Sequence, residues 1–257
     1  MIKKIIKKVL MLIKKIIKKV LYVRELFKRI GKNEILVLGD SHAGVFSNYG
    51  ASMPSHWFRV VSVGGATISG LKNPNSVTQS MPIFKEAIDE FRGNICITLL
   101  GEVDAGFVIW YRAQNIKADA RELLNKTLQN YADFIESIPL DKNVIIISAP
   151  LPTIQDGQDW GEIANLRKEV NATQLERTNL TLELNRRMES YANESGAIFI
   201  NLDAVSLNDR GIVKSSLLNG NCHNHHYDTK SYLEILIPKL QIIIEQIGEG
   251  NVASRRT

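Results

Sequence analysis

Short apolar runs alternate along most of the chain with longer polar or amphipathic stretches. Five of the runs are rich in Ile, Val and Leu and have the length of buried β-strands. They are 34–39 (EILVLG), 57–63 (WFRVVSV), 94–100 (NICITLL), 143–148 (NVIIIS) and 197–202 (AIFINL). The stretches between and after them predict helices at about 77–91, at 117–138, within the charged stretch 160–193 and at 229–247. This alternation predicts a mostly parallel five-stranded sheet with helices on both faces, which is a three-layer αβα sandwich.

The first part of the chain has a different pattern. Residues 2–12 (IKKIIKKVLML) are repeated almost unchanged as residues 13–23 (IKKIIKKVLYV). The period of 11 residues is close to three α-helical turns, so the apolar positions form one stripe and paired lysines face the other way. The repeat therefore predicts a basic amphipathic helix ahead of the α/β domain.

Lysines interrupt this segment every two or three residues, so it holds no apolar span long enough to cross a bilayer. It also lacks the uninterrupted apolar region and small-residue cleavage site of a signal peptide. We interpret residues 1–30 as an interfacial helix on an anionic membrane surface. The alternative is a helix that packs on the acidic body or on another copy of the chain. We expect a cytoplasmic protein, with a peripheral position at the inner face of a membrane.

Charge is divided unequally between this segment and the rest of the chain. Residues 1–32 contain twelve Lys or Arg and one acid, Glu25, which gives a net charge of +11. The whole chain has a net charge of +5, so residues 33–257 carry −6. An acidic body argues against nucleic-acid binding. The predicted organisation is a basic helix at 1–31, an α/β domain at 32–247 and a flexible tail at 248–257.

Three groups of small and polar residues follow the first three predicted strands. They are Gly39–His42 (GDSH), Gly64–Thr67 (GGAT) and Gly101–Asp104 (GEVD). In a parallel sheet these strand ends meet at one edge, where α/β proteins bind ligands. A serine at such a turn exposes its hydroxyl, and a small turn brings backbone N–H groups close to a ligand. Each group alone is equally consistent with a tight turn or a helix cap.

A fourth group, at 221–228 (NCHNHHYD), comes just before the last predicted helix. It contains three of the five histidines of the chain and is the only dense supply of imidazole. A histidine here would act as a general base for Ser41. The alternative is a metal site that uses the histidines with Cys222 and Asp228, although adjacent histidines do not easily converge on one ion.

Taken in this order, the four groups resemble those of the SGNH/GDSL hydrolase family, over about residues 33–247. The resemblance implies a flavodoxin-like αβα sandwich and the activity of an esterase, lipase, deacetylase or acyltransferase. It implies that Ser41 is the nucleophile and that the N–H groups of Ser41 and Gly65 are oxyanion donors. The family's histidine is followed six residues later by an aromatic residue. His226 with Tyr232 has this spacing, so His226 is the expected base, with His225 second and His223 third.

The sequence departs from the family's pattern at two places. The third group normally supplies an Asn side chain to the oxyanion, and Val103 stands at that position. The acid that orients the histidine normally lies three residues before it, and no Asp is found there. Asp209 and Asp228 are the remaining candidates, and a Ser-His dyad is the other option.

Four further residues are expected to bind substrate or orient the catalytic groups, with no metal and no cofactor. They are Asp40, His42, Glu102 and Asp104.

Three functions fit this sequence. The first is a serine-dependent esterase or acyltransferase that acts on O-acyl groups of a carbohydrate or lipid-linked glycan near a membrane. The second is a non-catalytic module on the same fold that binds a carbohydrate or a partner, motivated by Val103. The third is a metal-dependent hydrolase that uses the histidine group with Asp40 or Asp104.

Overall fold

A five-stranded sheet with every strand parallel forms the centre of the molecule, in the order β2-β1-β3-β4-β5. The structure is a computed structural model that describes residues 30–49, 53, 55–157, 170–221 and 224–248. The strands are β1 (Asn33–Gly39), β2 (His56–Ser62), β3 (Ile95–Leu99), β4 (Asn143–Ile147) and β5 (Ile198–Ile200). All five predicted strands are therefore present, with ends shifted by at most two residues.

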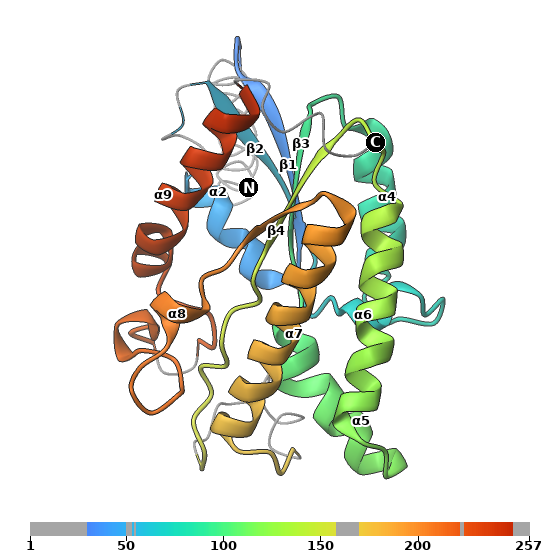
Figure 1. Cartoon of the computed structure of the whole chain (residues 1–257), viewed down its shortest axis with the longest axis vertical. Helices are drawn as coiled ribbons and strands as arrows, with labels where there is room; N and C mark the ends of the chain where they lie inside the picture. Colours follow the sequence, from blue (N-terminus) through green and yellow to red (C-terminus); the bar gives the residue numbers. More distant parts are fainter. Residues whose placement is uncertain (1–29, 50–52, 54, 158–169, 222–223, 249–257) are drawn as a thin grey trace, which may run out of the picture.

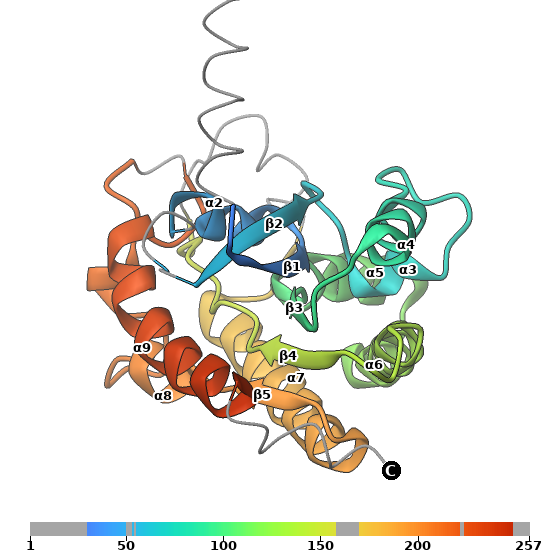
Figure 2. The same cartoon turned by 90° about the horizontal axis from the view of Figure 1, so that it is seen from above.

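Helices cover both faces of this sheet (Figures 1 and 2). One face carries α3 (Ile68–Leu71), α4 (Ser80–Glu90), α5 (Ile109–Ile116), α6 (Ala120–Glu136) and α7 (Gln174–Ser195). The other carries η1 (Ser41–Val45), α2 (Phe46–Tyr49), α8 (Asp203–Ser206), η5 (Ser215–Leu217) and α9 (Thr229–Gly248). A one-turn π-helix, η2 (Asp104–Val108), precedes α5. The predicted three-layer αβα sandwich is confirmed.

Alternate residues of each central strand face different cores. In β1, Leu36 and Leu38 pack with α4, α6 and α7, whereas Ile35 and Val37 pack with α9. Successive side chains of a strand point to opposite faces, so a strand covered on both sides must be apolar at every position. This is why the strands appear in the sequence as uninterrupted apolar runs.

Two predicted helices begin later than the sequence pattern suggested. The helix expected at 117–138 begins at Ala120, because Lys117 has a left-handed backbone (φ 52°) and Asp119 caps the new helix by accepting from the N–H of Arg121. The separate helix α5 before this break was not predicted. The helix expected at 77–91 begins at Ser80, after the left-handed Gln79 (φ 45°).

The long charged stretch contains α7, whose N-terminus is defined by a capping box. The Thr173 hydroxyl accepts from the N–H of Glu176, and the Glu176 carboxylate accepts from the N–H of Thr173. Residues 158–169 lie outside the described residues. So do residues 1–29 and 249–257, so the N-terminal helix and the flexible tail stay predictions. Within the described ranges, no helix combines the length and the apolar character needed to cross a membrane.

Candidate active site

Ser41 lies directly after β1, at the first position of η1. The turn is tight because Gly39 packs against β3. A Cβ atom on Gly39 would lie 2.3 Å from the carbonyl oxygen of Leu99, so only glycine fits. Asp40 caps η1 by accepting from the N–H of His42 at 2.8 Å, and the Ser62 hydroxyl donates to the Asp40 carbonyl at 2.7 Å. These contacts fix the backbone on both sides of the half-buried Ser41.

The fold brings His226 to Ser41 across 185 positions of sequence. Nε2 of His226 and Oγ of Ser41 are 2.7 Å apart, which is within hydrogen-bond distance. The two residues come from opposite ends of the domain, one after β1 and the other just before α9. His226, the expected base, is therefore placed against the serine hydroxyl.

Asn224 holds the other side of the His226 ring. Its Oδ1 lies 2.7 Å from Nδ1 of His226 and also accepts from the backbone N–H of His226 at 3.0 Å. A backbone N–H can only donate, so the Asn224 oxygen rather than its NH₂ group faces the histidine. Nδ1 must then carry the proton, which leaves Nε2 as the acceptor for the Ser41 hydroxyl. The three residues form a Ser-His-Asn series.

The sequence did not identify Asn224, because the residue expected to orient the histidine was an aspartate. Asp228, one of the two acids considered, instead accepts from the N–H and hydroxyl of Ser231 at the start of α9. These hydrogen bonds lower the pKa of its carboxyl. The other candidate, Asp209, is exposed. Asn224 could have been found from a broader criterion, a side-chain oxygen near the histidine that can accept from Nδ1.

Two hydrogen bonds fasten the histidine loop to the chain that follows β4. The Thr153 hydroxyl donates to the carbonyl of His225 at 2.6 Å, and the hydroxyl of Tyr227 accepts from the N–H of Leu151 at 2.7 Å. These contacts lie on either side of His226 in the sequence. They fix the backbone that carries the imidazole, so His226 is positioned by β4 as well as by Asn224.

Two further imidazoles lie beside His226. The His225 ring centroid is 4.2 Å from that of His226, and the His42 centroid is 4.6 Å from it. His42 is buried, and its Nδ1 lies 3.0 Å from Oδ1 of the buried Asp40. His42 and Asp40 thus form a buried pair behind the Ser-His contact. His223 lies outside the described residues.

Asp104 has a different place from the one expected for a substrate-binding residue. It is fully buried, and its two carboxylate oxygens accept from the N–H groups of Ile68 (2.7 Å) and Ser69 (3.0 Å) at the start of α3. Burial raises the pKa of Asp104 to about 6, although the two backbone hydrogen bonds act in the opposite direction. Asp104 therefore fastens the turn that carries Gly65 from inside the protein, and its expected role in binding substrate or orienting the catalytic groups stays a prediction.

Gly65 and the third group complete this edge of the sheet. Gly65 is exposed and has φ +72°, a backbone that favours glycine. Val103 is 8% exposed and offers no side-chain donor. Glu102 is buried, and its Oε1 lies so near Gly106 that a Cβ there would approach it to 2.9 Å. Glu102 is therefore enclosed by protein rather than open to a ligand.

A small cavity of about 210 Å³ adjoins the Ser-His pair. Ser41, Asn224 and His226 line it, together with Asn219 and Tyr232 from the chain that leads into and forms α9. Both ring nitrogens of His226 are already engaged by Ser41 and Asn224. Among the described residues, which omit Cys222 and His223, no group of three metal-ligating side chains converges.

Solved structures share this architecture at low sequence identity. A GDSL-like lipase from Bacteroides thetaiotaomicron has a TM-score of 0.54 and 17% identity, over 84% of this chain and 89% of that one. A G-D-S-L family protein from Desulfitobacterium hafniense, described as lipolytic, has a TM-score of 0.51 and 13% identity, over 82% and 99%. The aryl esterase of M. smegmatis has a TM-score of 0.51 and 12% identity, over 83% and 99%. No protein-family model and no curated protein matches the sequence. The chain therefore has the SGNH/GDSL hydrolase fold, as the sequence predicts.

Proposed function

We propose that this chain, which has the fold of the SGNH/GDSL hydrolases, is a serine-dependent ester hydrolase or acyltransferase. The observation that carries the proposal is the 2.7 Å contact between Nε2 of His226 and Oγ of Ser41, with Nδ1 of His226 held by Asn224. This arrangement places a base within reach of a nucleophile and orients the base with a third group. Proteins with the same fold include a lipase and an aryl esterase.

In the proposed reaction, Oγ of Ser41 bonds to the acyl carbonyl carbon while Nε2 of His226 takes the hydroxyl proton. The carbonyl π electrons move to oxygen, where the N–H groups of Ser41 and Gly65 would donate to the developing charge. Collapse of this intermediate expels the alcohol, which receives the proton from His226 and leaves an acyl-serine. Water or a sugar hydroxyl then attacks, and the same proton transfers in reverse order release Ser41.

We further propose that the acyl group is carried by a carbohydrate or lipid-linked glycan near a membrane. The support is the basic N-terminal segment, because residues 1–32, which contain the predicted amphipathic helix, carry +11 and suit an anionic surface at the inner face of a membrane. Gly64 and Gly65, on the turn after β2, are also exposed, so a large substrate can reach their backbone.

The proposal is tested with Ser41→Ala in a short-chain aryl ester assay, with Ser47→Ala as the control. Ser47 is an exposed serine on α2, six positions from Ser41. We expect Ser41→Ala to lose turnover by about 10³-fold or more, because the nucleophile is gone, and Ser47→Ala to match the parent. Equal turnover by Ser41→Ala and the parent would exclude Ser41 as the nucleophile.

A second candidate function follows from Val103. Loss of one oxyanion donor costs about 10²–10³ in rate, so an SGNH fold without it also suits a module that binds carbohydrate or a partner without turnover. A fluorophosphonate probe, which reacts with activated serines, separates the two functions. Labelling that disappears in Ser41→Ala supports the enzyme, and absence of labelling supports the binding module.

A further inference from the structure

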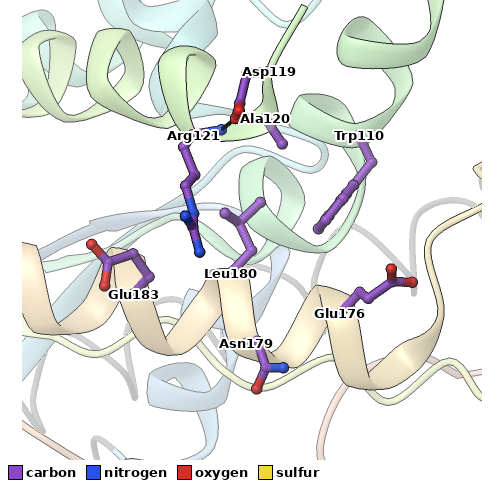
Figure 3. Close-up of a pocket in the computed structure, with 8 residues that line it drawn as sticks. All are labelled: Trp110, Asp119, Ala120, Arg121, Glu176, Asn179, Leu180 and Glu183. Carbon is purple, nitrogen blue, oxygen red and sulfur yellow. Dashed lines mark hydrogen bonds between the residues drawn. The ribbon is translucent and has the colours of Figure 1, made fainter.

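A second and larger cavity lies apart from Ser41, on the opposite face of the sheet. Its volume is about 760 Å³, and it opens between the first half of α7 and the corner where α5 leads into α6 (Figure 3). The site at Ser41 packs with α9 on the other face. Both α5 and the beginning of α7 project beyond the carboxyl ends of the strands (Figure 1), so the cavity is at the same end of the molecule as Ser41. The mechanism above uses no residue of this cavity.

One wall of the cavity is an aromatic ring in a fixed orientation. The indole N–H of Trp110 donates to the carbonyl of Ala105 at 2.9 Å, which prevents the ring from turning away. Leu180, from α7, is 6% exposed and forms the apolar floor beside it (Figure 3). A ring that is already held loses little side-chain entropy when a ligand packs on its face. Trp110 and Leu180 therefore form a ready apolar platform.

The rim of the cavity carries donors and acceptors side by side. The Arg121 guanidinium extends from the start of α6 toward Leu180 (Figure 3), and no carboxylate of the described residues lies within ion-pair distance of it. On the other side, Glu183 is neutralised by two hydrogen bonds from Arg186. Glu176 uses its Oε2 in the α7 capping box, and Oδ1 of Asp119 accepts from the N–H of Arg121.

We propose that this cavity binds a neutral segment of an oligosaccharide. A pyranose ring has a face of C–H groups that packs on the negative face of an indole, and hydroxyls that both donate and accept at its edge. An anionic ligand would meet the carboxylates of Asp119 and Glu176, and a cationic one would meet Arg121. The volume of about 760 Å³ lies within the range of about 300–1,000 Å³ that is typical of ligand-binding pockets. The inference goes beyond the proposed function, because binding here requires neither Ser41 nor an acyl group.

Isothermal titration of the full-length protein with sugars of matched length and different charge tests this proposal. The neutral probes are cellotetraose and the tetramer of N-acetylglucosamine, and the charged probes are the glucosamine tetramer and tetragalacturonate. We expect millimolar or tighter binding of at least one neutral probe, and at least about 10-fold weaker binding of the charged ones.

Substitutions locate the binding at the cavity. Trp110→Ala should weaken binding of the neutral probe by at least about 10-fold, whereas Trp110→Phe, which keeps an aromatic face, should retain more of the affinity. Arg121→Gln should weaken it by about three- to tenfold. Arg112→Gln is the matched control, because Arg112 is exposed on α5 and does not line the cavity. It should bind as the parent does.

Two results would overturn the proposal. One is that neither neutral sugar binds at about 10 mM. The other is that Trp110→Ala and Arg121→Gln bind as the parent does while circular dichroism shows both to be folded. Ser41→Ala separates this proposal from the catalytic one. It should bind the sugar normally and lose aryl ester turnover, so failure of one function leaves the other measurable.

Discussion

At the scale of single residues, Asn224 is the most informative member of the site. It fixes the His226 tautomer through Nδ1, as an aspartate would, but it brings no negative charge. In the proposed reaction, the imidazolium that forms when His226 takes the proton from Ser41 is therefore less stabilised than it would be beside a carboxylate. Asn224 provides the orientation of a triad without its full electrostatic contribution.

Asn224→Asp and Asn224→Leu separate these two contributions. Aspartate keeps an acceptor for Nδ1 and adds a charge, so we expect activity equal to or up to about tenfold above the parent, with the acidic limb of the pH–rate profile moved to higher pH. Leucine accepts no hydrogen bond, and we expect turnover to fall by about 10²–10⁴-fold because the tautomer is no longer fixed. If Asn224→Leu retained parental turnover at unchanged stability, Asn224 would have no role in orienting His226.

Asp104 gives a second prediction at this scale. Its pKa is about 6 in the folded protein, against 3.8 as the ordinary value that we take for the unfolded chain. The folded protein therefore holds this proton more tightly, so the stability it contributes is complete below pH 3.8 and is lost as the pH rises through 6. The loss amounts to about 3 kcal/mol by pH 7, at 1.36 kcal/mol for each unit of pKa.

Asp104→Asn removes this titration, and urea unfolding at pH 4, 5, 6 and 7 measures the effect. We expect the free energy of unfolding of the variant, minus that of the parent, to rise by up to about 3 kcal/mol between pH 4 and pH 7. Asp203, whose pKa burial also raises to about 6, is unchanged in both proteins and cancels in this difference. A difference that falls with pH would mean that the hydrogen bonds from Ile68 and Ser69 outweigh burial.

At the scale of elements, the extension of β4 holds the histidine loop of the candidate active site. The hydroxyl of Thr153 donates to the carbonyl of His225, directly before the base. Thr127 makes the same kind of bond, to the carbonyl of Leu123 within α6, far from the site in the fold. Both threonines are buried, at 4% and 2% exposure, so they form a matched pair.

Thr153→Val and Thr127→Val should each lower the free energy of unfolding by about 0.5–1.5 kcal/mol, because each removes one hydrogen bond with little change of shape. Only Thr153→Val should lower kcat, by about three- to tenfold, since only that bond positions the backbone of His226. Aryl ester kinetics measure the effect of each variant on kcat, and urea unfolding measures its effect on the free energy of unfolding. If Thr153→Val and the parent had equal kcat values, the hydrogen bond from Thr153 to His225 would contribute to stability alone.

Elements also show what the sequence could and could not predict. The central strands β1, β3 and β4 were predictable because they are buried on both faces and must be apolar throughout, as Ile35–Leu38 are. The break between α5 and α6 was not, because it depends on a left-handed backbone at Lys117, a residue type that gives no such signal. Ser41 and His226 were predicted from their resemblance to the SGNH/GDSL family's motifs, together with the place of Ser41 at a strand end. Asn224 depends on a loop conformation that places an amide against Nδ1.

At the scale of the whole molecule, the fold brings polar residues from distant parts of the chain together at one edge of the sheet. Ser41 follows β1 and His226 precedes α9, so the reactive pair exists only when the central strands and the last helix are both in place. The proposed sugar cavity lies on the other face, formed by α5, α6 and α7. The proposed acyl chemistry and the proposed glycan binding can therefore be tested independently, because the two cavities share no lining residue.

The uneven division of charge carries the last prediction. Residues 1–32 hold +11 and residues 33–257 hold −6, so the full chain should bind phosphatidylcholine vesicles containing about 30% phosphatidylglycerol and dissociate as salt is raised. Four lysines of the repeat are changed to glutamine in one variant, and four exposed lysines of the body in a control that loses the same charge. The repeat variant changes Lys3, Lys4, Lys7 and Lys8, and the control changes Lys85, Lys126, Lys230 and Lys239.

At about 1 kcal/mol for each basic residue near the surface, the repeat variant should bind up to about 10³-fold more weakly in a sedimentation assay. The control makes the acidic body four charges more negative but leaves the repeat intact, so it should lose far less binding than the repeat variant. Equal loss in both variants would show that net charge, rather than the N-terminal repeat, holds the protein at the membrane.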